Sequence, residues 1–141
     1  MTVMGDDPAR EAWSIAFGLA MRNRGRLISA LEELELTFMQ AHVLRLLEGS
    51  RPMPMGDLAD VLHCDASNVT GIVDRLEARG LVERRSAPHD RRVKVLALTP
   101  AGLQLRRRVL RAMTEPPEAL RRIPAEDQLA LRDILRRAVA P

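Results

Sequence analysis

The feature that most restricts the fold is a pair of short helical segments with a tight break between them, followed directly by two extended segments. GDLADVLH carries apolar residues at helical spacing, and the break at CD makes Asp65 a favourable N-cap for ASNVTGIVDRLEARG. Gly80 then marks the end of this second helix. A short helix, a tight turn and a second helix together predict a helix-turn-helix unit.

The extended segments LVERRS and VKVLAL are rich in Val and Leu, and a loop with Pro88 and Asp90 joins them. This pattern predicts a β-hairpin whose second strand begins at Val93. A hairpin directly behind a helix-turn-helix unit is the winged variant of that unit. Alternation along the second strand predicts one side facing the core, formed by Val93, Val95 and Ala97, with Lys94 on the solvent side.

A long helix is expected before this unit, because Asp7 and Pro8 suit a helix start and no proline follows before Glu35. About 28 residues at ~1.5 Å rise extend roughly 40 Å, which is more than the width of a small domain. The apolar stripe of this helix therefore needs cover from outside its own domain. A second copy of the chain is the economical source of that cover.

Composition excludes several kinds of protein. The chain has 141 residues, is 46% hydrophobic and carries a net charge of +3, and nearly all its basic residues are arginines, which suit phosphates and base edges. One Trp, two Phe and no Tyr are too few aromatic side chains for stacking single-stranded nucleic acid. A single Cys permits no internal disulfide, and no apolar run approaches the ~20 residues that span a bilayer. We therefore expect a cytoplasmic protein without a membrane partner.

The sequence shows no pattern typical of catalysis or of metal binding. It contains no Ser-His-Asp constellation, no glycine-rich phosphate loop, and no CxxC or HxxxH spacing. We expect no enzymatic activity, no metal site and no cofactor.

The helix after the break has two different faces. Its apolar face consists of Val69, Ile72, Val73 and Leu76 at i, i+3, i+4 and i+7. The remaining surface carries Ser67, Asn68, Thr70, Gly71, Asp74 and Arg75, of which only Arg75 is long. Small side chains let a helix lie deep in a DNA major groove, which is about 12 Å wide. The alternative is a plain amphipathic helix with a small polar surface.

Specific roles follow from these residue types. Asn68 is suited to an adenine edge, Thr70 to a thymine methyl group, and Arg75 to a phosphate or a guanine. Asp74 counts against the DNA hypothesis, because its carboxylate would lie close to phosphates unless it is paired. The sequence does not indicate its partner, which has to come from elsewhere in the fold.

Residues 58–102 contain the motifs VDRLEARGLVER, DRR and LTPAG. Through these motifs the region closely resembles the MarR family of bacterial winged helix-turn-helix regulators. The segments LTFMQAHVLRLL and IPAEDQLALRDILRRAV extend the resemblance. It implies a homodimer with intertwined terminal helices, whose two lobes bind a pseudo-palindromic site in double-stranded DNA. Members are mostly repressors released by small anionic or phenolic ligands, or by oxidation. Gly71 is a departure, since many members carry a basic residue there.

The expected fold is mainly α with a small β-hairpin wing, in which a winged helix-turn-helix lobe is joined to N- and C-terminal dimerisation helices. Residues 1–36 would form the N-terminal dimerisation helix and residues 37–98 the DNA-binding lobe. Residues 99–141 would form the C-terminal helices, which also serve dimerisation.

The hairpin is expected to contact DNA through Asp90, Arg91 and Arg92. An arginine on a narrow ribbon fits a narrow A·T minor groove, where the negative potential is enhanced. Asp90 is expected to brace the guanidinium of Arg92.

A ligand site is the second hypothesis drawn from the resemblance. The family's effector crevice lies near residues that here are Trp13, Phe17, Met21, Phe38 and His42. These side chains suit a small aromatic or anionic effector, whose carboxylate would meet His42 or Arg24. The simpler interpretation is that they form core and dimer interface.

We therefore expect a dimeric, sequence-specific transcriptional regulator, a repressor relieved by a small aromatic or anionic ligand. One alternative is a sequence-tolerant architectural DNA-binding protein. Another is a redox-responsive regulator acting through Cys64, although a structural thiol is the ordinary interpretation of that residue.

Overall fold

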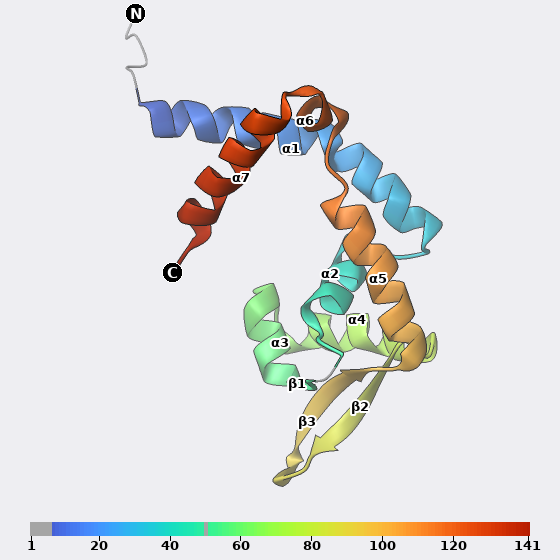
Figure 1. Ribbon diagram of the computed structural model, residues 1–141. Helices are drawn as coiled ribbons and strands as arrows, with labels where there is room; N and C mark the ends of the chain where they lie inside the picture. Colours follow the sequence, from blue (N-terminus) through green and yellow to red (C-terminus); the bar gives the residue numbers. More distant parts are fainter. Residues whose placement is uncertain (1–6, 50) are drawn as a thin grey trace, which may run out of the picture.

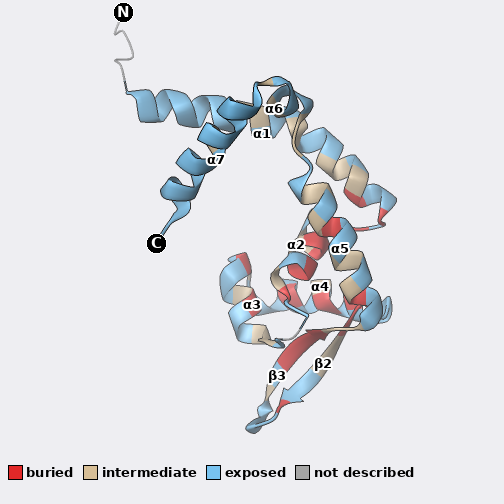
Figure 2. Cartoon of the chain, in the orientation of Figure 1, coloured by how far each residue is buried: buried red, intermediate tan, exposed pale blue. Residues whose placement is uncertain are grey.

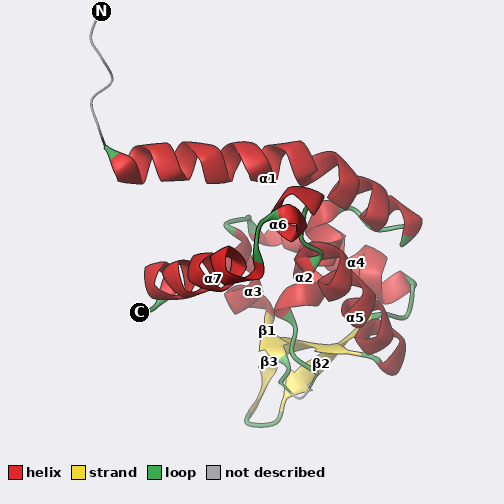
Figure 3. Ribbon diagram, turned by 45° about the horizontal axis from the view of Figure 1, so that its top comes forward, coloured by secondary structure: helices red, strands yellow, loops and turns green. Residues whose placement is uncertain are grey.

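The computed structural model describes residues 7–49 and 51–141, and it confirms a mainly α fold with a small antiparallel sheet (Figure 1). Helices α2 to α4 and the sheet form one lobe, from which α5 leads away, while α1 and α7 extend beyond it (Figures 1 and 3). The order is α1 (Pro8–Glu33), α2 (Phe38–Leu46), β1 (Met53–Pro54), α3 (Met55–Leu62), α4 (Ala66–Ala78), β2 (Val82–Ala87), β3 (Asp90–Leu98), α5 (Pro100–Thr114), α6 (Glu118–Arg122) and α7 (Ala125–Val139).

Side-chain caps explain where the helices begin. Asp7, Thr37, Asp65 and Thr99 each accept a hydrogen bond from a backbone N–H in the first turn of the helix that follows. At Thr37 the cap is reciprocal, because the side chain of Gln40 accepts a hydrogen bond from the Thr37 backbone N–H. These bonds satisfy donors that a helix start otherwise leaves unpaired. The helix starts expected from the sequence are therefore confirmed to within a residue or two.

The wing belongs to a three-stranded antiparallel sheet with the strand order β1-β3-β2. Met53 pairs with Leu96, so the proline-containing segment before α3 forms an edge strand. β3 begins at Asp90, and not at Val93 as expected, because pairing with β2 continues to Ala87 and Asp90 beside the tip. The charged residues between Asp90 and Val93 hide this extension from a pattern of apolar alternation.

The expected core face of β3 is confirmed at two of its three residues, but the strand also buries a residue on its other side. Leu96, which lies on the same side of the strand as Lys94, is completely buried in the hydrophobic core. Val95 and Ala97 are buried as expected, and Val93 is only partly buried. Lys94 is exposed although it lies on the same side of β3 as Leu96. The exposure of Lys94 therefore does not show that this whole side of the strand faces solvent.

Burial is concentrated in the lobe (Figure 2). The core combines the end of α1 with α2, α3, α4, the bases of β2 and β3, and Val109 of α5. Among the described residues, Leu31 is the only buried residue of α1, and α7 has none.

The short helix α6, between two proline-containing segments, was not expected from the sequence. No helix in the described ranges is long and apolar enough to cross a membrane.

Candidate nucleic-acid interface

Helix α4 packs against the lobe through the face expected from the sequence. Val69, Val73 and Leu76 are buried and Ile72 is partly buried. The opposite side is exposed and consists of the residues that the sequence singled out, Ser67, Asn68, Thr70, Gly71 and Arg75. The structure thus presents these side chains together on one solvent-facing surface, which we call the α4 polar face.

Hydrogen bonds order the first turn of the α4 polar face. Asp65 Oδ1 accepts hydrogen bonds from the Asn68 backbone N–H at 2.9 Å and from Ser67 Oγ at 2.8 Å. These two bonds, led by the one from Asn68, hold the pKa of the Asp65 carboxyl below its ordinary value. Thr70 Oγ1 donates to the Ala66 carbonyl at 2.9 Å, which leaves its methyl group and oxygen lone pairs available to a ligand.

Asp74 has a partner that the sequence could not identify. Arg84, on β2, pairs with the Asp74 carboxylate and also with Glu77 Oε1, at 3.3 Å. The guanidinium therefore neutralises part of the negative charge of α4 and joins that helix to the wing. The sequence indicates no partner for Asp74, but in the structure it belongs to a three-residue ion-pair cluster with Arg84 and Glu77.

The wing carries the expected residues at its far end, but the expected brace is wrong. Asp90, Arg91 and Arg92 are exposed, at the start of β3. Asp90 Oδ1 accepts a hydrogen bond from the backbone N–H of Arg92, at 2.9 Å. No ion pair joins the two side chains within the described ranges. The carboxylate therefore orders the backbone of the turn, and the Arg92 guanidinium extends without that restraint.

A shallow hollow of about 420 Å³ adjoins the α4 polar face. It is lined by Ser67, Asn68, Gly71 and Arg75 from α4, and by Thr37 and Met39 from the start of α2. Sequence reasoning missed Thr37 and Met39 as surface neighbours of α4, because about 30 residues separate them along the chain. Their only sequence signal was the Thr37 cap, which indicates a helix start and no contact.

Cys64 also lines this hollow. Its thiol is partly buried, and Sγ donates a long hydrogen bond of 3.4 Å to the Leu62 carbonyl. Within residues 7–49 and 51–141, no cluster of three or more His, Cys, Asp or Glu side chains is placed to hold a metal ion.

The residues expected to bind an effector are divided between two places. Met21, Arg24 and Phe38 line a cavity of about 360 Å³ between α1 and α2. The Trp13 and Phe17 rings lie nearer the N-terminus of α1, with centroids 6.1 Å apart, and neither residue lines that cavity. The structure therefore brings Met21, Arg24 and Phe38 together and leaves Trp13 and Phe17 apart from them.

His42 stacks on Phe38, with ring centroids 6.1 Å apart. Its Nδ1 accepts a hydrogen bond from Arg45 Nε at 3.3 Å. Partial burial, followed by repulsion from Arg45, lowers the pKa of the His42 ring. A neutral His42 ring that already accepts a hydrogen bond from Arg45 is a poor partner for a ligand carboxylate. Of His42 and Arg24, Arg24 is therefore the better placed to bind that carboxylate.

A helix with a small polar face, a preceding short helix and a β-sheet wing define a winged helix-turn-helix protein. The family model for the MarR family matches residues 36–94. FarR of Neisseria gonorrhoeae, an HTH-type transcriptional regulator, is 31% identical over 106 residues, which cover 74% of this chain and 73% of FarR. The chain belongs to the MarR family.

Other relatives match over a shorter region. The transcriptional repressor MprA of Escherichia coli is 36% identical over 90 residues, which cover 64% of this chain. The chain spans about half the length of such relatives, 51% of MprA and 45% of the Bacillus subtilis regulator YfiV.

Solved structures share the fold. Wild-type MarR of E. coli in its apo form has a TM-score of 0.74 at 22% identity, and the alignment covers 90% of this chain and 96% of MarR. A mutant of MepR from S. aureus, bound to an oligodeoxyribonucleotide, has a TM-score of 0.67 at 22% identity, over 90% of this chain and 95% of MepR.

Proposed function

We propose that the protein is a homodimeric transcriptional regulator that binds double-stranded DNA in a sequence-specific way, a repressor relieved by a small aromatic or anionic ligand. The α4 polar face is the observation that carries this proposal. Apart from Arg75, its residues are small, and the face is exposed and rich in hydrogen-bonding groups, which suits entry into a major groove. MprA, a relative, is a transcriptional repressor, and MepR, a structural neighbour, has been solved with an oligodeoxyribonucleotide.

Each part of the interface has its own role in this proposal. Asn68, Thr70 and Ser67 contact base edges in the major groove, and Gly71 lets the backbone approach closely. Arg75 contacts a phosphate or a guanine. Arg91 and Arg92 enter the adjacent minor groove from the wing. The Arg84 ion pairs reduce the repulsion that Asp74 and Glu77 would otherwise exert on phosphates.

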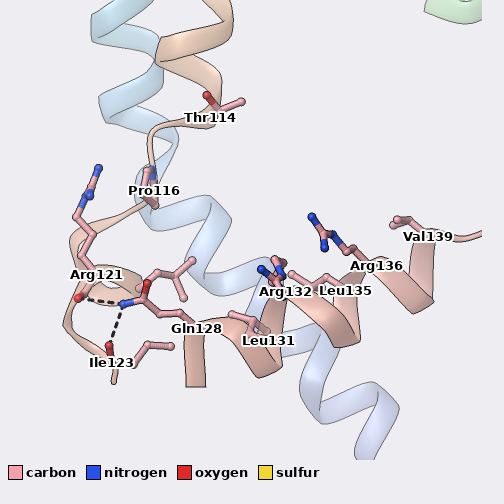
Figure 4. Close-up of a pocket in the computed structure, with 11 residues that line it drawn as sticks. Thr114, Pro116, Arg121, Ile123, Gln128, Leu131, Arg132, Leu135, Arg136 and Val139 are labelled. Atoms are coloured by element: carbon pink, nitrogen blue, oxygen red, sulfur yellow. Dashed lines mark hydrogen bonds between the residues drawn. The ribbon is translucent and has the colours of Figure 1, made fainter. Parts of the chain in front are cut away.

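The exposed apolar surfaces of α1 and α7 support a homodimer. Trp13 is 69% exposed and Ile134 is 52% exposed, far more than large apolar side chains are in a stable core. Leu131 and Leu135 line an open hollow of about 640 Å³ beside α6 (Figure 4). The same two leucines line a second hollow of about 580 Å³ against α1, together with Ile15 and Leu19. A second copy that inserts its own terminal helices would cover both hollows.

The position of α7 is set by local bonds, so its apolar face is presented in a defined direction. Gln128 Nε2 donates to the Ile123 carbonyl at 2.9 Å and to the Arg121 carbonyl at 3.4 Å (Figure 4). Residues 1–36 and 99–141 would then supply the dimer interface, and residues 37–98 the DNA-binding lobe.

The effector part of the proposal rests on the cavity lined by Met21, Arg24 and Phe38. Apolar walls with one guanidinium suit a small aromatic carboxylate. A ligand that prefers a lobe arrangement unsuited to the DNA site would shift the population away from binding. Titration of the protein with salicylate in a calorimeter should show binding heat, and salicylate should weaken DNA binding. Arg24→Gln should reduce both effects, and no heat from the wild type would contradict this part of the proposal.

Footprinting on the DNA upstream of the protein's own reading frame tests the central proposal. We expect two protected half-sites with centres about one helical turn apart, roughly 34–36 Å. Affinity for this site should exceed affinity for unrelated duplex by at least about 10³-fold at the same salt concentration. Equal affinity for both duplexes would favour the architectural alternative, and a flat salt dependence would argue against DNA binding altogether.

A further inference from the structure

Arg79 links α4 directly to the end of α1. It is the C-cap residue of α4, and its guanidinium reaches across the lobe. Nη1 donates to the Glu35 carbonyl at 2.6 Å, and Nη2 donates to the Leu34 carbonyl at 3.2 Å. These carbonyls lie 44 and 45 residues before Arg79 in the chain.

The carbonyls that Arg79 binds belong to a tightly ordered helix end. Glu35 has a φ of 55°, and the N–H groups of Glu35 and Leu36 donate back to the carbonyls of Glu32 and Leu31. This pattern is a Schellman motif, completed by the burial of both Leu31 and Leu36. The motif directs the chain from α1 toward α2 and leaves the Leu34 and Glu35 carbonyls to find another donor.

A guanidinium suits this position for two physical reasons. Its fork of donors satisfies two neighbouring carbonyls at once, which an ammonium group does less well. The positive charge also lies at the C-terminal ends of both α1 and α4, where each helix dipole is negative. Apart from this link, α1 packs mainly against α2 and α5 and makes little contact with α4. Arg79 is therefore a direct polar connection between the two helices.

We propose that Arg79 is a positioning residue that sets the angle of α4 relative to α1, and thereby the spacing of half-sites that the dimer accepts. This inference rests on the proposed function, in which α1 belongs to the dimer interface and α4 enters DNA. Arg84 attaches one side of α4 to the wing, Thr99 binds the carbonyl of Gly80 just after α4, and Arg79 ties α4 to the end of α1. Loss of the Arg79 bonds leaves the lobe folded and lets it tilt.

Binding to two half-site spacings tests the proposal. The wild-type protein first selects its preferred duplex from a random library, and one base pair is then inserted between the half-sites. The insertion shifts one half-site by about 3.4 Å and rotates it about the DNA axis. We expect the wild type to lose at least about tenfold in affinity. Arg79→Met keeps the aliphatic stem and removes the donors, and should reduce that loss several-fold.

Two further variants separate positioning from stability. Arg79→Lys retains one donor group and should restore part of the spacing preference. Arg111→Met removes the same charge from an exposed site in the last turn of α5, and it should keep the wild-type preference for half-site spacing. General destabilisation would lower the active fraction equally on both duplexes and leave their ratio unchanged.

A measurement without DNA completes the test. Spin labels on Thr70→Cys in a Cys64→Ser background report the distance between the two α4 helices of a dimer. Arg79→Met should broaden this distance distribution, while Arg111→Met should not. A wild-type spacing preference together with an unchanged distribution in Arg79→Met would overturn the proposal. If the wild type selects no sequence, the proposed function fails, and the label distances still decide the role of Arg79.

Discussion

Gly102 shows how closely α5 approaches the end of α4. Thr99 Oγ1 donates to the Gly80 carbonyl at 2.6 Å, and the Thr99 backbone N–H donates to the Leu81 carbonyl at 3.1 Å. Thr99 also caps α5 by accepting a hydrogen bond from the Gly102 backbone N–H at 3.0 Å. A Cβ atom at Gly102 would lie 1.8 Å from the Leu81 carbonyl oxygen, so the glycine of the LTPAG motif is a steric requirement.

Gly102→Ala should destabilise the protein by about 3 kcal/mol, because α5 has to move away from the backbone of Leu81. Urea unfolding followed by circular dichroism measures this change. Gly71→Ala is the matched control, since open space surrounds Gly71 in the middle of α4. That control should gain up to about 1 kcal/mol in stability. A Gly102→Ala variant as stable as the wild type would contradict the close approach.

His42 should make stability depend on pH. Its folded-state pKa is lowered, mainly by burial, so the unfolded chain takes up the proton first as the pH falls. The contribution of His42 is present above about pH 6.5 and is lost progressively below that value. The melting temperature should therefore fall between about pH 7 and pH 5, and fall less in His42→Gln, which cannot titrate. If the melting temperatures of the wild type and His42→Gln fall equally with pH, His42 does not contribute to the pH dependence of stability.

At the scale of elements, α4 is held by residues that other elements supply. Its apolar face enters the core, Arg84 of β2 pairs with Asp74, and Arg79 binds the end of α1. These three attachments hold α4 while the α4 polar face stays exposed. The wing is attached to the same helix through Arg84, so the two proposed DNA-contacting elements are directly linked.

Substitutions in the wing test whether it contacts DNA. Arg92→Ala should weaken binding to the selected duplex by about 1–3 kcal/mol without loss of stability. Asp90→Ala should also weaken binding, although it removes a negative charge, because the carboxylate orders the turn through the Arg92 backbone N–H. Fluorescence anisotropy at fixed salt measures both effects. Tighter binding by Asp90→Ala would show that the net charge of the wing outweighs the order of its turn.

At the scale of the whole molecule, the lobe has a complete core while α1 and α7 do not. The buried residues end where α1 leaves the lobe, and α7 exposes Leu129, Ile134, Leu135 and Val139 (Figure 2). Apolar surface of this extent is stabilised when a partner covers it. The proposed homodimer therefore completes a fold that one chain leaves open.

Leu135→Glu should weaken self-association by at least about tenfold, because it places a charge in the face that the second copy would cover. Sedimentation velocity over a range of protein concentrations measures the change. Arg137→Gln, an exposed polar site on the same helix, is the control and should associate like the wild type. Unchanged association of Leu135→Glu would place the interface elsewhere.

Much of the fold could be predicted because its signals are local. Thr37, Asp65 and Thr99 bind backbone groups within three residues, so each helix start is visible in a short window of sequence. The two faces of α4 follow from helical periodicity for the same reason. The five-residue helix α6 was missed because it is too short to show a period and prolines flank it.

Apart from α6, the sequence by itself determined which helices form, where they begin, and which side of α4 is small and polar. Only the tertiary structure decided that Arg84 neutralises Asp74, that Leu96 is buried on the other side of β3 from Val95, that Thr37 adjoins the α4 polar face, and that Arg79 reaches the end of α1. Capping and periodicity depend on neighbours along the chain. Ion pairs and core faces depend on which distant segments packing brings together, and no local pattern of residues specifies that.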